Sequence, residues 1–551
     1  MSPSPTWSGM AERPGRRVVG VVLTVLAAAA VWAALVVPDR PDRLSPSGFL
    51  SIPVEALAVV GLALVLRGRW RRALGVVFGL AAGVLLVLRM LDLGFRQVFD
   101  RSFDPVNDWG YLGPGIGVLG DSVGRPAALA VVAGAVAVVL ALLVVLPLCT
   151  LRVLRAVGRH RRGSLRAVVA LGTVWAVCAA TGVQLADEAP VASAGAARLG
   201  YDELRHLRAD IEDRHRFARE IAADRLAGAP ARRLLAGLRG KDVLLVFVES
   251  YGRVAVQGSS FSPDVDAVLD RGTRELRRAG WSARSAFVTS PTFGAGSWLA
   301  HSTLQTGLWV DSQQRYDQLL TTHHSTLSGL FDRAGWRTVF DVPAITHAWP
   351  EGEAFYGFDK LYDAGDVGYR GPRFGYATMP DQFTLAALWR HELAPPDRRN
   401  VMAEVDLVSS HHPWAPLPHL VPWSRVGDGS VFDGMPAHGQ TAGEVFSDPA
   451  KVRAAYGQSV QYTWRTLVSW LRLHRDPNLV LVVLGDHQPH DYVTGPGVDH
   501  DVPISIIAHD PAVLRRVGGW RWQDGLHPQP DAPVWRMDRF REHFLAAFGT
   551  R

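Results

Sequence analysis

The sequence predicts an α/β protein: a five-helix N-terminal membrane domain, then an extracytoplasmic domain with a mostly parallel central sheet flanked by helices. The first third of the 551-residue chain is rich in Ala, Val and Leu, whereas the rest has the composition of a water-soluble domain. In that remainder, short apolar runs alternate with helical patterns, and acidic residues and histidines follow the apolar runs. We expect a membrane domain over residues 1–186, a juxtamembrane helical linker over 187–238 and a catalytic domain over 239–551.

Five apolar runs approach or exceed the roughly 20 residues that cross a bilayer as a helix. Arginines cluster before the first run, between the second and third, and between the fourth and fifth, so these segments are predicted to be cytoplasmic. The N-terminus is then cytoplasmic, and everything after Asp187 lies outside the plasma membrane, in a chain whose composition is typical of GC-rich bacteria. The runs cover approximately residues 18–37, 49–66, 73–91, 127–148 and 167–185.

Charge and cysteine content exclude several functions. The net charge of +6 does not indicate nucleic-acid binding, because much of the excess arginine lies in the loops between apolar runs. The two cysteines, Cys149 and Cys178, lie in or beside apolar runs. The extracytoplasmic part therefore has no disulfide, no thiolate metal ligand and no cysteine nucleophile.

The elements of the soluble part follow from periodicity. A charged segment over residues 201–225 has helical spacing and predicts an amphipathic connecting helix near the membrane. Continuous Val- and Leu-rich runs predict buried parallel strands, and helical patterns between them predict an α/β sheet. We expect strands at 242–248, 337–342, 401–408, 479–484 and 502–508, and helices at 265–278, 327–334, 382–393, 449–473 and 537–548.

Three of these strands are followed by residues of the types that bind metal ions. Glu249 follows the first strand, Asp486 and His487 follow the fourth, and His411 follows the third. Ligands in such sheets bind at the carboxyl ends of the strands, so these side chains are expected to converge on one divalent ion. Any one of them alone is also consistent with a helix cap or a loop hydrogen bond.

Residues 290–301 supply a hydroxyl group and a helix start whose N–H groups can face an anion. Thr292 or Ser297 can serve as a nucleophile. The alternative reading is that Thr292 only makes a turn and Ser297 caps the helix, and capping is the role we expect for Ser297.

These motifs resemble the lipoteichoic acid synthase and membrane phosphoethanolamine transferase branch of the sulfatase-like, alkaline-phosphatase superfamily, whose synthases also have five spans before an extracytoplasmic domain. VFVESYG and GDHQP resemble the segments that place metal ligands on Glu249, Asp486 and His487. SPTFGAGSW, SSHHPW and THAWPEGEAFYGFDKLYD resemble the segments that bear the nucleophilic threonine, a phosphate-contacting histidine and a substrate-contacting tryptophan. The resemblance places those roles on Thr292, His411 and Trp349.

Two departures limit the substrate and the chemistry. Glu351 stands where the glycerol-phosphate synthases have an arginine, which weakens the expectation of a glycerol-phosphate substrate. The soluble domain has no cysteine and no Cys/Ser-x-Pro-x-Arg motif, so a formylglycine sulfatase is not expected. Phosphoryl transfer fits a hydroxyl nucleophile beside one divalent ion.

We therefore expect Glu249, Thr292, Asp486 and His487 to bind one Mn, Mg or Zn ion, and Thr292 to attack a phosphodiester of a membrane lipid. A cell-envelope glycan or polymer would accept the phosphoryl group. His411 and His500 are expected to hold phosphate oxygens or protonate the leaving group. His500 and Asp501 either complete a second metal position or anchor a loop, and His301, His347, His412 and His490 are expected to be structural or rim residues. The alternatives are a hydrolase that passes the intermediate to water, and an inactive envelope-assembly or sensor protein.

Overall fold

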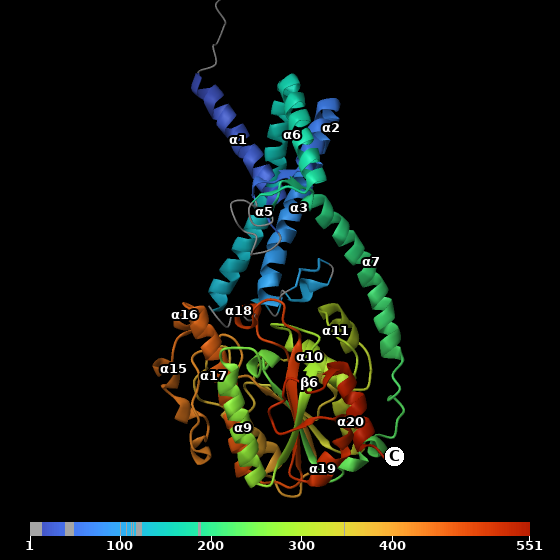
Figure 1. The fold of residues 1–551 in the computed structure, drawn as a ribbon, viewed down its shortest axis with the longest axis vertical. Helices are drawn as coiled ribbons and strands as arrows, with labels where there is room; N and C mark the ends of the chain where they lie inside the picture. The colour runs from blue at the N-terminus through green and yellow to red at the C-terminus, as the bar shows by residue number, and fades with distance from the viewer. Residues whose placement is uncertain are drawn as a thin grey trace, which may run out of the picture. The chain divides into compact units, whose positions relative to one another are not determined.

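The computed structural model describes residues 14–38, 49–99, 101–105, 107–111, 113, 115–116, 124–185, 189–346 and 348–550 (Figure 1). The chain divides into two compact units, residues 1–97 with 101–212 and residues 98–100 with 213–551. The division falls inside the segment predicted as a linker.

The first unit is made of apolar helices. Among the described residues, four helical segments are long and apolar enough to cross a membrane: Val18–Val36, Arg69–Arg96, Arg125–Arg159 and Arg161–Thr181. The predicted second span is helical only over 12 residues, roughly 18 Å against a hydrocarbon core of about 30 Å. Five spans are therefore not confirmed. The elements are α1 (Pro14–Val36), β1 (Ile52–Pro53), α2 (Val54–Val65), α3 (Arg69–Phe99), α5 (Arg125–Arg159), α6 (Arg161–Thr181), β2 (Gln184–Leu185), β3 (Ala189–Pro190) and β4 (Ala192–Ser193).

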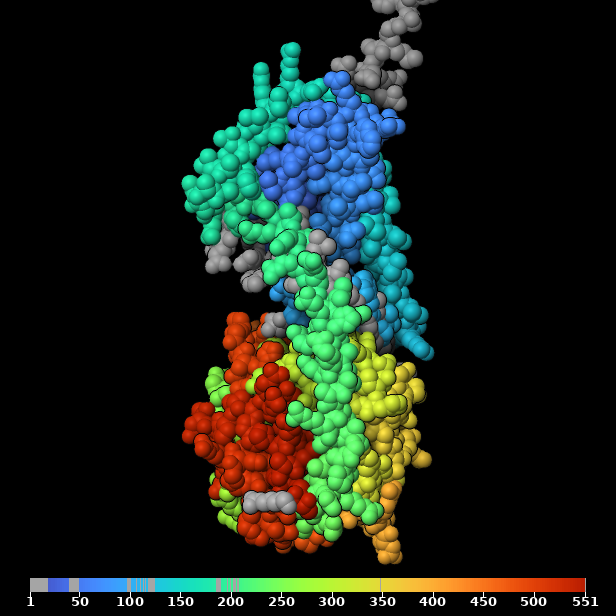
Figure 2. Space-filling view, turned by 90° about the vertical axis from the view of Figure 1, so that its right-hand side faces the viewer, coloured from blue at the N-terminus to red at the C-terminus, as the bar shows by residue number. Residues whose placement is uncertain are grey.

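The predicted amphipathic helix is α7 (Gly195–Ala222). Its last turns belong to the second unit, where Arg315 donates to Asp213 through Nε at 2.7 Å and Nη2 at 2.6 Å. Phe217 is fully buried against Tyr316 and Leu319. In Figure 2 this end of α7 and the chain after it form a green band between the red C-terminal residues and the yellow ones. The segment that begins at Asp213 is thus part of the second unit.

The second unit is built on a nine-stranded sheet with the order β12-β6-β11-β10-β5-β9-β7-β8, in which β13 also pairs with β6. Strands β10, β5, β9, β7 and β8 are parallel to one another, whereas β11 is antiparallel to both β10 and β6. The sheet is therefore mixed, and a mostly parallel sheet is not confirmed. The strands are β5 (Asp242–Val248), β6 (Ser282–Thr289), β7 (Arg337–Asp341), β8 (Lys360–Tyr362), β9 (Val401–Leu407), β10 (Leu479–Gly485), β11 (Asp501–Ala508), β12 (Gln523–Asp524) and β13 (Val534–Arg536).

Helices cover both faces of this sheet, and in Figure 1 α9 and α17 lie on one side of β6 and α20 on the other. Side chains alternate along β5: Leu244, Val246 and Val248 join the core under α9 and α17, while Val243, Leu245 and Phe247 join the core under α10, α12 and α20. The helices are α8 (Ala231–Leu234), α9 (Ser262–Arg278), α10 (Ser297–Thr306), α11 (Gln313–Leu320), α12 (Leu327–Ala334), α13 (Pro350–Tyr356), α14 (Asp381–Leu388), α15 (Met435–His438), α16 (Ala442–Val445), α17 (Pro449–Leu473), α18 (Asp491–Thr494), α19 (Pro511–Arg516) and α20 (Phe540–Phe548).

One carboxyl group of the sheet makes stability depend on pH. Asp341, the last residue of β7, is 2% exposed, and its Oδ2 has no hydrogen-bond partner. Burial and the nearby Glu392 charge raise the pKa of Asp341 to about 8. The folded protein therefore holds a proton here that the unfolded chain releases near pH 4. As pH rises from 4 to 8 this group lowers the free energy of unfolding, by at most about 5 kcal/mol.

Asp341→Asn is expected to weaken the dependence of the free energy of unfolding on pH. The variant should exceed the wild type in stability most clearly at pH 8 and above. Urea unfolding of the purified protein at pH 5, 7 and 9 measures the effect. Asp363→Asn, on a more exposed carboxylate after β8, is the matched control and should leave the pH profile unchanged. Equal profiles for Asp341→Asn and the wild type would contradict the prediction.

Candidate metal and nucleophile site

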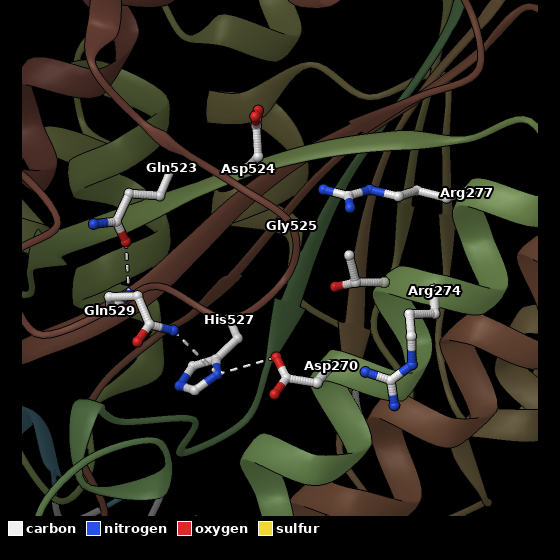
Figure 3. Close-up of a pocket in the computed structure, with 9 residues that line it drawn as sticks. Asp270, Arg274, Arg277, Gln523, Asp524, Gly525, His527 and Gln529 are labelled. Atoms are coloured by element: carbon white, nitrogen blue, oxygen red, sulfur yellow. Dashed lines mark hydrogen bonds and ion pairs between the residues drawn. The ribbon is translucent and has the colours of Figure 1, made fainter.

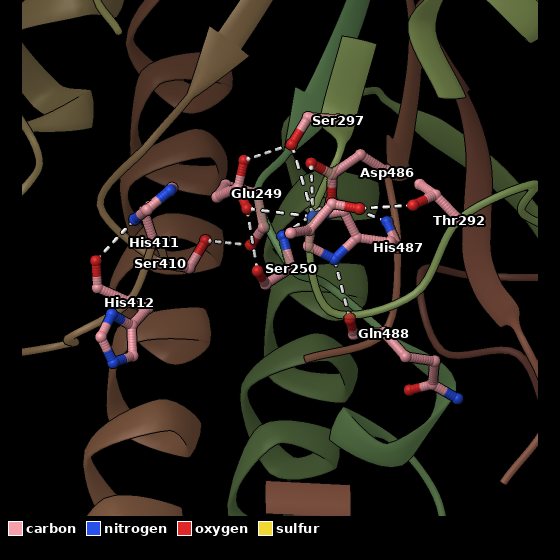
Figure 4. Close-up of polar contacts among 12 residues, drawn as sticks. Glu249, Ser250, Thr292, Ser297, Ser410, His411, His412, Asp486, His487 and Gln488 are labelled. Carbon is pink, nitrogen blue, oxygen red and sulfur yellow. Dashed lines mark hydrogen bonds and ion pairs between the residues drawn. The ribbon is translucent and has the colours of Figure 1, made fainter. Parts of the chain in front are cut away.

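Two parallel strands bring three predicted metal ligands together. Glu249 follows β5 and Asp486 and His487 follow β10, and the register pairs Gly485 with Val248. One ligand atom from each of the three lies within 4.8 Å of the others. His487 Nε2 is 3.4 Å from Glu249 Oε1 and 3.6 Å from Asp486 Oδ2 (Figure 4). The strand-end residues read from the sequence therefore form one group.

A serine hydroxyl completes this group. Ser297 Oγ is 3.1 Å from Glu249 Oε2 and 3.4 Å from His487 Nε2. Ser297 is the first residue of α10, and the cap position before it is held by Gly296 at φ 85°. The prediction that Ser297 caps the helix is therefore wrong. The left-handed glycine starts the helix, which frees the Ser297 side chain to reach the carboxylate.

Thr292 lies in the turn that leads to this helix. Its hydroxyl donates a hydrogen bond to the carbonyl of Ala295, and its backbone N–H donates to Ser290 Oγ at 3.3 Å. Among the described contacts, the hydroxyl that meets Glu249 and His487 is that of Ser297, and the Thr292 hydroxyl is directed into its own turn. That Thr292 joins the ligand group stays a prediction.

The hydrogen bonds of His487 fix which ring nitrogen faces the acids. His487 Nδ1 is 2.7 Å from the carbonyl oxygen of Gln488, which can only accept a hydrogen bond. When the ring is neutral, Nδ1 carries the proton and the lone pair of Nε2 faces Glu249 and Asp486. In that tautomer a cation placed between Nε2 and the two carboxylates would be bound by all three residues.

The spacing of the donors fits such a cation. Donor atoms around a tetrahedral ion with bonds of about 2.1 Å lie about 3.4 Å apart. Four separations within the group run from 3.1 to 3.6 Å, with Ser297 next to Oε2 of Glu249 and His487 next to Oε1. Asp486 and His487 are each 1% exposed, and burial together with the Glu249 charge raises the pKa of Asp486 to about 6. Two acids, an imidazole and a hydroxyl in this spacing suit Zn, Mn or Mg.

Backbone groups hold the carboxylates in place. Asp486 Oδ1 accepts from the N–H groups of Ser250 and His487, both at 2.7 Å. Ser250 has a φ of 55°, a strained conformation for a serine, and its carbonyl accepts from Tyr456 Oη at 2.8 Å. A Cβ on Gly485 would lie 1.9 Å from the carbonyl oxygen of Tyr251, so only glycine fits there. Sequence reasoning missed Ser250 and Tyr456, and Gly485 was visible only as part of the Gly-Asp-His motif.

His411 lies on the Glu249 side of the group (Figure 4). Its ring stacks on Tyr376 with centroids 3.7 Å apart, and its Nδ1 contacts the carbonyl of His412. Burial lowers the pKa of His411 to about 4, so the ring is neutral at pH 7. Because the carbonyl only accepts, Nδ1 carries the proton and Nε2 keeps a free lone pair.

The remaining predicted residues make contacts of their own. Trp349 precedes α13, is half-buried, and packs in the apolar cluster that contains Leu299 of α10. The His500 ring lies 5.3 Å from Phe293, and its carbonyl accepts from the N–H of Ser290. Asp501 Oδ2 pairs with Arg253 at 2.8 Å and its Oδ1 accepts from Thr289 at 2.7 Å. Asp501 therefore anchors its loop. His347 lies outside the described residues.

The second unit also has a pocket between α9 and β12 (Figure 3). Charges of both signs line it, with His527 between the α9 carboxylates Asp266 and Asp270 at 3.2 and 3.3 Å. Its lining includes none of the residues predicted for catalysis or metal binding. The candidate site is therefore the strand-end group, and this pocket is separate from it.

No family model and no curated protein matches the chain. Solved structures do match. They include the lipoteichoic acid synthase LtaP from Listeria monocytogenes (15% identity, 57% of this chain and 76% of that one, TM-score 0.37). The phosphoglycerol transferase GacH of Streptococcus pyogenes, in complex with sn-glycerol-1-phosphate, matches at 14% identity over 61% of this chain and 90% of that one, with a TM-score of 0.36. The C-terminal periplasmic domain of EcEptC from Escherichia coli matches at 15% identity over 49% and 72%, with a TM-score of 0.33. All three TM-scores are below 0.5, so the resemblance to the sulfatase-like, alkaline-phosphatase superfamily rests on the sequence motifs.

Proposed function

We propose that this protein is a membrane-attached, metal-dependent phosphoryl-group transferase that acts on a phospholipid headgroup or cell-envelope polymer, with Ser297 as the nucleophile. The observation that carries the proposal is the position of the Ser297 hydroxyl. It lies 3.1 Å from Glu249 and 3.4 Å from His487, in a group whose spacing suits a divalent ion. The proposed nucleophile is therefore Ser297, whereas the sequence alone indicated Thr292.

Glu249, Asp486, His487 and Ser297 would hold the ion, which when bound favours ionisation of the hydroxyl and offsets the negative charge of the phosphate. Ser297 donates its hydroxyl hydrogen to Glu249 Oε2, so a carboxylate stands ready to take the proton. The Oγ then forms a bond to phosphorus as the bond to the lipid alcohol breaks, and the alcohol leaves with a proton from solvent. The product is a phosphoserine diester, in which the phosphorus keeps its bond to the headgroup.

The first turn of α10 adds to phosphate binding. Ser297 is its first residue, so the phosphate would lie at the positive end of a ten-residue helix. The N–H groups of a helix start are natural donors to phosphate oxygens. The same residue therefore supplies the nucleophile and marks the anion-binding end of the helix.

His411 is suited to the second half of the reaction. Its neutral ring with a free Nε2 can take the proton of an acceptor hydroxyl, which attacks the phosphoserine and releases Ser297. Of the two roles expected from the sequence, holding phosphate oxygens or protonating the leaving group, the second does not suit a ring whose pKa is about 4, because that ring is not an imidazolium at pH 7; the role proposed here is that of a general base.

His411→Gln is expected to leave phosphoserine formation in place and to slow its resolution by roughly 10²- to 10³-fold. Intact-mass spectrometry during turnover should then show the phosphoryl adduct accumulating. His474→Gln is the control, because His474 is also a histidine whose pKa burial lowers to about 4, but it stacks on Trp389 instead. A His411 variant that slows adduct formation and resolution equally would contradict the base role.

The donor is proposed to be a membrane lipid and the acceptor an envelope glycan or polymer. The support is that four apolar helices long enough to span a bilayer belong to the same chain as the site. A hydrolase is the second candidate, because a free His411 Nε2 can activate water as readily as an alcohol. Release of diacylglycerol from labelled anionic phospholipid vesicles, with and without added acceptor, separates the two.

The decisive experiment locates the covalent intermediate. Detergent-purified full-length protein is exposed to anionic phospholipid, quenched and digested, and the peptide that covers residues 285–315 is analysed by mass spectrometry. A phosphoryl group on Ser297 supports the proposal. A phosphoryl group on Thr292, or turnover with no adduct in either the wild type or His411→Gln, overturns it.

A further inference from the structure

A second group of metal-ligating side chains lies one helical turn from Ser297. His301 follows Ser297 by four residues on α10, so the two share a helix face. Glu404 and Asp406 alternate along β9 and point to the face that α10 covers. His301 Nδ1 is 3.0 Å from Glu404 Oε1 and 3.7 Å from Asp406 Oδ1. One ligand atom from each of the three lies within 4.8 Å of the others.

We propose that His301, Glu404 and Asp406 form a second divalent-cation site, distinct from the one at Glu249, Asp486 and His487. The separations of 3.0 and 3.7 Å bracket the donor spacing around such an ion, about 3.0 Å for octahedral and about 3.4 Å for tetrahedral geometry with bonds of about 2.1 Å. An imidazole and two carboxylates are the donors that Zn and Mn take.

The charge of this group supports a cation. Glu404 is 2% exposed, and Asp406 Oδ1 is enclosed and receives no hydrogen bond. Within the described part of the chain, His301 is the one basic side chain that forms an ion pair with either acid. Two ionised carboxylates against one imidazolium would leave a net negative charge in the interior, which is costly, and burial accordingly raises the pKa of Asp406 well above its ordinary value when no ion is present. A divalent ion beside a neutral imidazole balances the two acids.

The site is held in position before any ion arrives. The His301 ring stacks on Phe247 of β5 with centroids 3.8 Å apart at 12°, which aims Nδ1 at the acids. Gln305, the next turn of α10, donates to Glu404 Oε2 and accepts from the N–H of Ser328 at 2.9 Å, leaving Glu404 Oε1 to face His301. The Asp406 side chain is 13% exposed.

The position of the second ion between β9 and α10 indicates a structural role. Phe247 pairs with Asp406 in the sheet and precedes Glu249 by two residues, so the site borders both β5 and α10. An ion there ties the helix that carries Ser297 to the strand neighbouring the one that carries Glu249. Its role is to position the nucleophile, and it makes no contact with substrate.

Metal content tests the proposal independently of activity. Full-length protein in detergent is stripped with a chelator, reloaded separately with Mn²⁺ or Zn²⁺, freed of excess ion and analysed by plasma mass spectrometry. The wild type should hold two ions per chain, and His301→Ala, Asp406→Asn and Glu249→Gln one each. The double variant Glu249→Gln/Asp406→Asn should hold none. His324→Gln, at another buried histidine whose ring nitrogens meet backbone carbonyls, should hold two.

The outcomes separate this site from the first. A wild type with one ion that His301→Ala and Asp406→Asn both retain overturns the second site and leaves the proposed function intact. Two ions that neither variant reduces also overturn it. Thermal unfolding in the presence and absence of the ion shows which variants fold, and Asp406→Asn, which conserves side-chain volume, decides if His301→Ala does not.

Discussion

Ser297→Ala is expected to abolish phosphoryl transfer, with a loss of roughly 10⁴-fold or more, while Thr292→Val loses less than about tenfold. The reason is geometric. The Ser297 Oγ contacts Glu249 and His487, whereas the Thr292 Oγ1 donates to Ala295 within its turn. Diacylglycerol release from labelled phospholipid measures both variants, and the mass of the protein shows whether either still forms an adduct.

Two further variants sharpen this comparison. Ser302→Ala removes a hydroxyl from the same helix, where Ser302 Oγ donates to the Leu299 carbonyl at 3.1 Å, and should keep most activity. Ser297→Thr keeps a hydroxyl in place and should retain a measurable fraction. If Thr292→Val is as inactive as Ser297→Ala and only Thr292 carries phosphate in the wild type, the assignment drawn from the sequence was right and this one is wrong.

The ligands could be predicted from the sequence because they follow directly from strands. Asp242–Val248 and Leu479–Gly485 are continuous apolar runs, and parallel neighbours end at the same edge, so Glu249, Asp486 and His487 had to be close. The choice between Thr292 and Ser297 could not be made, because it depends on the left-handed φ of Gly296. Spacing alone does not say which residue a loop turns toward the site.

Other features of the structure could not be predicted from the sequence, each for a different physical reason. Strand β6 has a polar beginning, with Ser282, Arg284 and Ser285 among its first four residues, and its apolar run is only three residues long, 286–288. Glu404 and Asp406 alternate with apolar residues in a way that is typical of a solvent-facing strand, yet α10 covers that face. The predicted second span contains Pro53 and becomes helical only after it.

Removing the metal ion should also inactivate the protein. Chelation is expected to reduce turnover by roughly 10³-fold or more, since a bound ion contributes several kcal/mol to such reactions. Adding back Mn, Mg or Zn should restore the wild type and leave Asp486→Asn inactive, because Asp486 Oδ2 faces the His487 lone pair. The metal that restores the most activity is the preferred ion.

The same carboxylate predicts how ion binding depends on pH. In the ion-free protein the pKa of Asp486 is raised to about 6, so below that pH a proton occupies the site that the ion needs. Affinity should therefore fall as the pH drops from 7 to 5, measured by calorimetric titration with Zn²⁺ or Mn²⁺. Asp501→Asn is the matched control, because the Asp501 carboxylate is already engaged by Arg253 and Thr289, and it should bind the ion as the wild type does. Loss of the ion in Asp501→Asn with retention in Asp486→Asn would place the metal at the other end of this loop and remove the basis for Ser297 as the nucleophile.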